Sequence, residues 1–233
     1  MIYSNIETGI FLSRPNRFTA EISIDGIRRI CHVKNTGRCR ELLVPGSQVL
    51  VQFHPNAAVL GRKTEYSLIA VYKNGILINM DSQAPNQAAR EWLSRYPDIQ
   101  QIRQEVTWGN SRFDLAFMEN GQTGYIEVKG VTLEADGIAR FPDAPTLRGL
   151  KHIRELTHMA KEQMDVSIIF VIQMKGVSRF EPNMATQPEF GMALSEAAEA
   201  GVKILAFDCT VSHDAVSRTL SLHMDQPVPV SLP

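Results

Sequence analysis

Three charged residues in the middle of the chain, Asp114, Glu127 and Lys129, have the types and spacing that metal-dependent hydrolysis requires. They lie on two short apolar segments joined by Asn120-Gly121, a dipeptide typical of two-residue β-hairpin loops. Pairing the segments about that turn places Asp114 directly opposite Glu127. Because side chains alternate along a strand, Lys129 is expected on the same face as Glu127, with the apolar residues beside them on the reverse.

Two carboxylates at one position of a sheet repel each other by a few tenths to about 1 kcal/mol, and a divalent cation would offset that repulsion. Asp and Glu are hard oxygen ligands that suit Mg²⁺ or Mn²⁺. A metal with open water positions activates water and stabilises charge on a phosphate, and Lys129 would orient or deprotonate that water. The alternative is an exposed hairpin in which Glu127 pairs with Lys129 or Arg112 in solvent, an interaction that contributes little to stability.

Several short stretches spread over most of the chain resemble the sugar fermentation stimulation protein A family. They are Asn35-Thr36-Gly37-Arg38, Glu41-Leu42-Leu43-Val44-Pro45-Gly46, Arg62-Lys63-Thr64, Ser111-Arg112-Phe113-Asp114, Glu127-Val128-Lys129-Gly130-Val131-Thr132-Leu133, Phe141-Pro142-Asp143-Ala144 and Arg148-Gly149-Leu150-Lys151-His152-Ile153-Arg154-Glu155-Leu156. The resemblance implies a mixed α/β fold class. An OB-like β-barrel, residues 1–82, would precede a PD-(D/E)XK, or restriction-endonuclease-like, domain with a mixed central sheet, residues 83–233. It also implies DNA binding and regulation of sugar use.

The sequence of the first unit, residues 1–82, predicts β-strands and no helix. Residues 18–24 and 27–33 alternate in polarity around an Asp-Gly turn, which predicts a hairpin. Further strands are expected at 48–53, 66–72 and 76–80. Five or six short strands separated by turns suit a small barrel.

A barrel of this kind binds nucleic acid through a basic groove and stacking aromatic side chains. Residues 1–82 hold ten Lys and Arg against six Asp and Glu, whereas the remainder holds fourteen against nineteen. This asymmetry fits an N-terminal unit that meets phosphates, although ordinary solvated surface would look the same. The candidate contacts are Arg14, Arg17, Lys34, Arg38, Arg40, Arg62 and Lys63.

The second unit is expected to begin with a helix from Asn86 to about Tyr96, after Pro85 and capped by Asn86. Glu91 borders its apolar stripe. In folds of the kind that the resemblance implies, an acid on this helix often joins the metal site. Glu91 is therefore a candidate third carboxylate, together with the backbone carbonyl of Val128. A surface glutamate on a helix is the alternative.

A second helix is predicted over 147–162, with Thr146 or Asp143 as its cap. Arg148, Lys151, His152 and Glu155 share one of its faces. This mixture of charged and polar side chains is also typical of a helix face exposed to solvent, but the resemblance implies that the helix lies beside the face of the sheet that holds the active site. Arg148 and Lys151 would then hold the phosphate chain, and His152 would shuttle a proton unless it is structural.

The rest of the second unit alternates strands and helices. Buried strands are expected at 166–172 and 202–207, and a helix at 190–200 ends at Gly201. The predicted order is helix, three strands, helix, strand, helix, strand.

The remaining features point to a cytoplasmic protein with no membrane partner, because no segment could span a bilayer and the start lacks signal-peptide character. Cys31, Cys39 and Cys209 are odd in number and lack Cys-x-x-Cys spacing, so reduced structural thiols are expected. The oligomeric state stays open, a homodimer included.

These features together favour a nuclease that hydrolyses phosphodiester bonds with Mg²⁺ or Mn²⁺, with DNA as the favoured partner and RNA as a possible one. The main alternative is a non-cleaving DNA-binding regulator of sugar (maltose) metabolism genes, although no helix-turn-helix recognition helix stands out. A third possibility is a structural or assembly protein that has only the fold.

Overall fold

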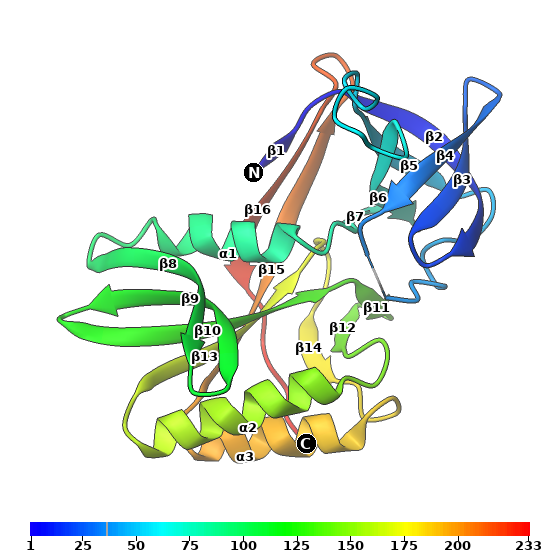
Figure 1. The fold of residues 1–233 in the computed structure, drawn as a ribbon. Coiled ribbons are helices and arrows are strands. Elements are labelled where there is room, and N and C mark those ends of the chain that lie inside the picture. The colour runs from blue at the N-terminus through cyan, green and yellow to red at the C-terminus, as the bar shows by residue number, and fades with distance from the viewer. Residues whose placement is uncertain (36) are drawn as a thin grey trace.

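The computed structural model describes residues 1–35 and 37–233 (Figure 1). Thr36, which belongs to the first of the motifs quoted above, lies outside the described residues. Within them, the chain forms a barrel, a seven-stranded sheet flanked by helices, and a three-stranded sheet.

The N-terminal barrel follows the order β4-β3-β2-β5-β6-β7 and is closed by a parallel pairing of β4 with β6. The expected OB-like barrel is therefore present. Its strands are β2 (Ile6–Asn16), β3 (Thr19–Ile24), β4 (Ile27–Val33), β5 (Gln48–Phe53), β6 (Tyr66–Lys73) and β7 (Ile76–Asn79). The sequence did not predict β2, because register shifts after Phe11 and Ser13 interrupt the two-residue alternation that marks a strand.

The second sheet has the order β1-β16-β15-β13-β10-β9-β8. Its central strands β10, β13 and β15 are parallel and its outer pairs antiparallel, so the predicted mixed sheet is confirmed. The strands are β1 (Ile2–Tyr3), β8 (Ile99–Trp108), β9 (Ser111–Glu119), β10 (Gln122–Val131), β13 (Asp165–Ile172), β15 (Lys203–Asp214) and β16 (Thr219–Pro227). Because β1 pairs with β16, the first residues lie in this sheet although we expected them in the barrel unit.

Helices cover both faces of the seven-stranded sheet (Figure 1). Helix α1 (Ala84–Leu93) packs on one face, and α2 (Leu147–Lys161) and α3 (Pro188–Glu199) pack on the other. We did not predict a small sheet of β11 (Leu133–Ala135), β12 (Ile138–Phe141) and β14 (Arg179–Pro182). It contacts the barrel through a 2.9 Å ion pair between Lys73 of β6 and Glu134 of β11. No helix in the described part of the chain is long and apolar enough to cross a bilayer.

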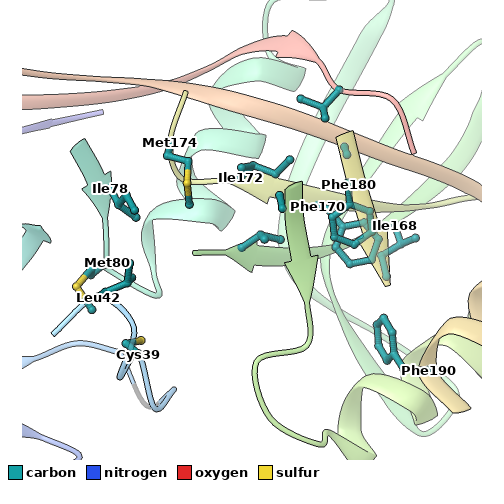
Figure 2. Packing of buried hydrophobic residues seen from close by; sticks show 14 of the residues in the cluster. Cys39, Leu42, Ile78, Met80, Ile168, Phe170, Ile172, Met174, Phe180 and Phe190 are labelled. Carbon is teal, nitrogen blue, oxygen red and sulfur yellow. The ribbon is translucent and has the colours of Figure 1, made fainter. Parts of the chain in front are cut away.

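One apolar core runs through the barrel and the second unit (Figure 2). Leu42 and Met80 from the barrel side belong to the same buried cluster as Phe170 and Phe180, whose rings stack with centroids 4.1 Å apart. A shared core fixes the position of the barrel against the sheet. The three cysteines are free and buried, and burial raises the pKa of each thiol to about 12, as expected for structural thiols.

Candidate active site

The β9–β10 hairpin has the predicted register. Asn120 and Gly121 both have positive φ, as a two-residue hairpin loop requires, and the ladder runs from the Gln122–Glu119 pair to the Ile126–Leu115 pair. The next pair would be Glu127 with Asp114. The ladder ends one residue earlier, so these two carboxylates lie at the point where the strands part.

Asp114 lies between β10 and the first turn of α1. Its Oδ2 accepts a 2.8 Å hydrogen bond from the backbone N–H of Val128, and its Oδ1 accepts a 2.8 Å bond from the amide of Asn86. Burial, with the nearby charge of Glu127, raises the pKa of Asp114 above its ordinary value. The predicted helix cap at Asn86 is wrong: the capping position is Gln83, and Asn86 sits inside the helix with its amide on Asp114.

Glu127 is only 2% exposed and is the centre of a charged cluster. Its Oε1 contacts both the ammonium of Lys129 and Nδ1 of His152, which is also buried. Burial on its own raises the pKa of Glu127, but the hydrogen bond from His152 and the charge of Lys129 together outweigh it, so the net pKa is lowered. Glu127 is therefore held as a carboxylate beside a lysine.

The second oxygen of Glu127, Oε2, is buried and has no hydrogen-bond partner among the described residues. An unsatisfied buried carboxylate oxygen is costly, and a bound cation would satisfy it. Hard oxygen donors from Glu127 and Asp114 match the ligands that Mg²⁺, Mn²⁺ and Ca²⁺ prefer. The residues present thus fit a divalent ion.

Glu91 has other partners in the structure. Its carboxylate accepts a 2.7 Å ion-paired hydrogen bond from the amino group of Met1 and a 2.8 Å bond from the amide of Gln87. In the part of the chain that the structure describes, no three His, Cys, Asp or Glu side chains gather as metal ligands. A third ligand, from Glu91 or the carbonyl of Val128, stays a prediction.

A cleft of about 600 Å³ at the junction of the barrel and the sheet leads to Asp114. Its lining includes Tyr3, Lys34, Asp81, Asn86, Gln87, Gln104, Glu105 and Asp114. The buried carboxylate of Asp81 accepts a 3.0 Å bond from Lys34 and a 3.1 Å bond from the hydroxyl of Tyr3. Lys34, a predicted phosphate contact, is thus ion-paired inside the protein.

Gly130, which follows Lys129, allows α1 to approach the active strand. A Cβ atom at this position would lie 2.6 Å from Cγ of Pro85 and 2.8 Å from Oε1 of Gln173. Only glycine admits this contact between β10 and the start of α1, which carries Asn86. Gly130 belongs to the Glu127–Leu133 motif, but its close packing against α1 was not predicted.

Helix α2 supplies the other side of the site. Thr146 caps it, as predicted, by accepting a 3.0 Å bond from the N–H of Gly149. His152 points inward to Glu127, whereas Lys151 reaches the carbonyl of Asn110 at 2.8 Å and Glu155 at 3.8 Å. Arg148, Lys151 and His152 line a hollow of about 390 Å³ together with Asn110, Ser111, Arg112 and Leu147.

The predicted phosphate contacts of the barrel other than Lys34 line two grooves. Arg14, Arg17, Arg38 and Arg40 line one of about 390 Å³, and Arg62 and Lys63 line one of about 560 Å³. The guanidinium of Arg14 also donates to four backbone carbonyls, those of Arg17, Asn35, Gly37 and Arg38, and therefore ties two loops together.

The fold and this site define a two-part protein, an OB barrel followed by a restriction-endonuclease-like domain with an Asp…Glu-x-Lys arrangement. Residues 12–80 match the model of the SfsA N-terminal OB domain, and residues 83–215 match that of the sugar fermentation stimulation protein RE domain. The chain belongs to the sugar fermentation stimulation protein family.

Curated relatives carry the same description over nearly their whole length. A sugar fermentation stimulation protein homolog of Desulfitobacterium hafniense is 53% identical, covering 93% of this chain and 94% of its own. One of Clostridium beijerinckii is 50% identical over 93% of this chain and 96% of its own. The solved structure of Pyrococcus furiosus SfsA in complex with Ca²⁺ is 28% identical, with a TM-score of 0.85, over 100% of this chain and 98% of that one.

Proposed function

We propose that this protein is a divalent-metal-dependent nuclease that hydrolyses phosphodiester bonds, using Mg²⁺ or Mn²⁺ and acting on DNA in preference to RNA in the cytoplasm. The observation that carries the proposal is the buried carboxylate of Glu127 near Asp114: its Oε1 contacts Lys129, and its Oε2 has no hydrogen-bond partner in the described part of the chain. The Ca²⁺ complex of the Pyrococcus furiosus relative supports a divalent ion in the same fold.

Asp114 and Glu127 would hold the ion, with the carbonyl of Val128 and Glu91 as further candidate ligands. A divalent ion there would activate water and stabilise charge on the scissile phosphate. Lys129 has its ammonium on Glu127 and would orient the attacking water at that point. On α2, Arg148 and Lys151 lie beside His152 and would bind the phosphate chain through their charges.

The test is incubation of the purified protein with labelled single- and double-stranded DNA and RNA in Mg²⁺, Mn²⁺ or EDTA. Wild type is expected to cut in the presence of metal, and Lys129→Ala and Glu127→Ala are expected to lose cutting. Lys161→Ala, an exposed residue at the end of α2, serves as the control and should cut normally. Cutting that persists in EDTA or in Lys129→Ala overturns the proposal.

A second candidate is a non-cleaving DNA-binding regulator of sugar metabolism genes. It is favoured by the occupation of Oε1 of Glu127 by both Lys129 and His152, and by the pairing of Glu91 with Met1. The same assay separates the two. Salt-sensitive binding with intact substrate under every metal supports the regulator, and binding to no nucleic acid supports a structural role.

A further inference from the structure

The groove that holds Arg62 and Lys63 lies where OB folds bind oligonucleotides. In that fold the ligand surface is formed by the second and third strands and by the loops between strands one and two and between strands four and five. Here these are β3, β4, the β2–β3 loop and the β5–β6 loop. The groove, about 560 Å³, takes residues from all four: Asn16, Phe18, Thr19, His32, Arg62, Lys63 and Thr64.

Phe18 presents an exposed aromatic ring in this groove. Its side chain is 46% exposed, yet its backbone is held firmly. Oδ1 of Asn16 accepts bonds from the N–H groups of Phe18 at 2.8 Å and Thr19 at 3.1 Å, and the carbonyl of Phe18 accepts a 2.7 Å bond from Val33. The ring is thus a partly exposed apolar surface on a segment whose backbone is fixed.

Cationic side chains surround the ring. The guanidinium carbon of Arg17 lies 4.7 Å from the ring centroid, and Arg62 is fixed by a 2.9 Å bond to Oγ of Ser67. The pKa values of His32 and His54 are lowered, first by partial burial and then by the positive charges of Arg62 and Lys34. Arg62 and Lys63 thus place positive charge at the groove, which the binding of phosphates needs.

A second basic groove adjoins the first. Asn16 lines both, and the second adds Arg14, Arg17, Arg38 and Arg40. A strand of nucleic acid laid along both would meet cations on either side of one aromatic ring, the combination by which single-stranded chains are bound without sequence preference.

We infer that Phe18 is a base-stacking residue and that the barrel binds a single-stranded stretch of nucleic acid along these two grooves. The inference rests on the nucleic-acid binding proposed above and names its substrate class. In a duplex, neighbouring bases cover both faces of each base, so the ring of Phe18 can stack only on a base that is unpaired or flipped out. The cationic side chains would then contribute to duplex binding through its phosphates, but stacking on Phe18 would not.

Binding of labelled oligonucleotides, measured by fluorescence anisotropy in EDTA so that no cutting can occur, tests the inference. Phe18→Ala should weaken binding of a 12-nucleotide single strand by roughly 5- to 150-fold and leave duplex binding nearly unchanged. The control is Met192→Ala, a 53% exposed apolar residue on α3, outside the barrel. It should bind like wild type.

A second variant, Phe18→Trp, reports stacking directly. Its added indole fluorescence should be quenched by the single strand and not by the duplex, after subtraction of the wild-type signal from Trp92 and Trp108. Equal losses for single strand and duplex in Phe18→Ala, absence of quenching, or no binding to any nucleic acid overturns the inference. Binding as expected without metal-dependent cutting leaves this inference standing and removes only the nuclease proposal.

Discussion

The side-chain amide of Asn86 donates a 2.8 Å hydrogen bond to Oδ1 of Asp114 and so connects α1 to the point where β9 and β10 part. The other oxygen of the same carboxylate accepts from the backbone of Val128. Two elements from different parts of the fold thus hold one acidic group in a fixed orientation, as ligand-supporting residues do in metal sites.

Replacing Asn86 is expected to weaken metal binding without unfolding the protein. Asn86→Ala removes one of the two hydrogen bonds that orient Asp114, and losses of this kind lower metal affinity or activity by about 10- to 100-fold. Calorimetric titration with Mn²⁺ measures the effect. Arg90→Ala, an exposed residue on the same helix, is the control. Equal affinities in the two variants would show that Asn86 does not position the carboxylate.

Asp114→Asn is expected to stabilise the fold near neutral pH. The raised pKa of Asp114, caused by burial and by Glu127, means that its ionised form costs folding free energy. An asparagine can accept from Val128 and donate to Asn86 after that amide turns over, so both hydrogen bonds survive. We expect the thermal midpoint to rise by a few degrees, since about 1 kcal/mol shifts it by roughly 2–4 °C in a chain of this size.

The pH dependence of that gain provides the check. A carboxyl with a raised folded pKa costs nothing below its unfolded pKa of 3.8, so the advantage of Asp114→Asn should vanish as the pH falls toward that value. Glu127→Gln should behave oppositely. The pKa of Glu127 is lowered, so its ion pairs stabilise the fold above the unfolded value of 4.5, and Glu127→Gln should be less stable there. Midpoints that shift in the same direction for both variants would contradict this account.

The β9–β10 hairpin could be predicted from the sequence because the residues that determine it are close together in the chain. A two-residue Asn-Gly loop permits one register, and that register brings Asp114 and Glu127 to the same place. The cap of α2 at Thr146 is equally local, since it depends on residues three apart. Both predictions needed no knowledge of the rest of the chain.

The missed features depend on partners far away in the sequence. Glu91 pairs with Met1, which lies 90 residues earlier. Asn86, which we predicted as a helix cap, instead bonds Asp114, which lies 28 residues later. The hairpin of β11 and β12 is local but was missed for another reason: its strands have only three and four residues, too few to show a periodicity, and only β12 pairs further, with β14. The basic pattern likewise did not show that Arg14, which lines a groove as Arg62 does, also bonds four backbone carbonyls.

Adding a methyl group at Gly130 is expected to displace α1 from the active strand. The new Cβ of Gly130→Ala would meet Pro85 and Gln173 at distances that neither can accept without moving, and such overpacking typically costs about 1–3 kcal/mol. Urea unfolding measures the loss. Gly109→Ala is the comparison variant, because a Cβ there would meet nothing within 4 Å. Any loss of stability in Gly109→Ala comes from the positive φ at that turn, a backbone strain that Gly130→Ala does not introduce. A Gly130→Ala protein of wild-type stability and metal affinity would mean that α1 can shift freely.

The buried carboxylate of Asp81 is expected to hold the barrel against the seven-stranded sheet. Asp81 lies just after β7 and bonds Tyr3 of β1 and Lys34 of the loop that follows β4. Asp81→Ala would leave that lysine, whose side chain is only 22% exposed, without its counter-ion, at a cost of roughly 3 kcal/mol. Tyr3→Phe removes the hydroxyl that donates to Asp81 and accepts from the amide of Asn79, and should cost about 1–3 kcal/mol.

Urea unfolding of both variants, with the exposed Asp98→Ala as the control, measures these costs. If Asp81→Ala unfolds at the same urea concentration as Asp98→Ala, the ion pair contributes nothing to the junction. In that case the apolar core shared by the two units, with Leu42 and Met80 on the barrel side, would be what holds them together. Leu42→Ala should then produce the larger loss, because truncating a fully buried leucine costs about 2–5 kcal/mol.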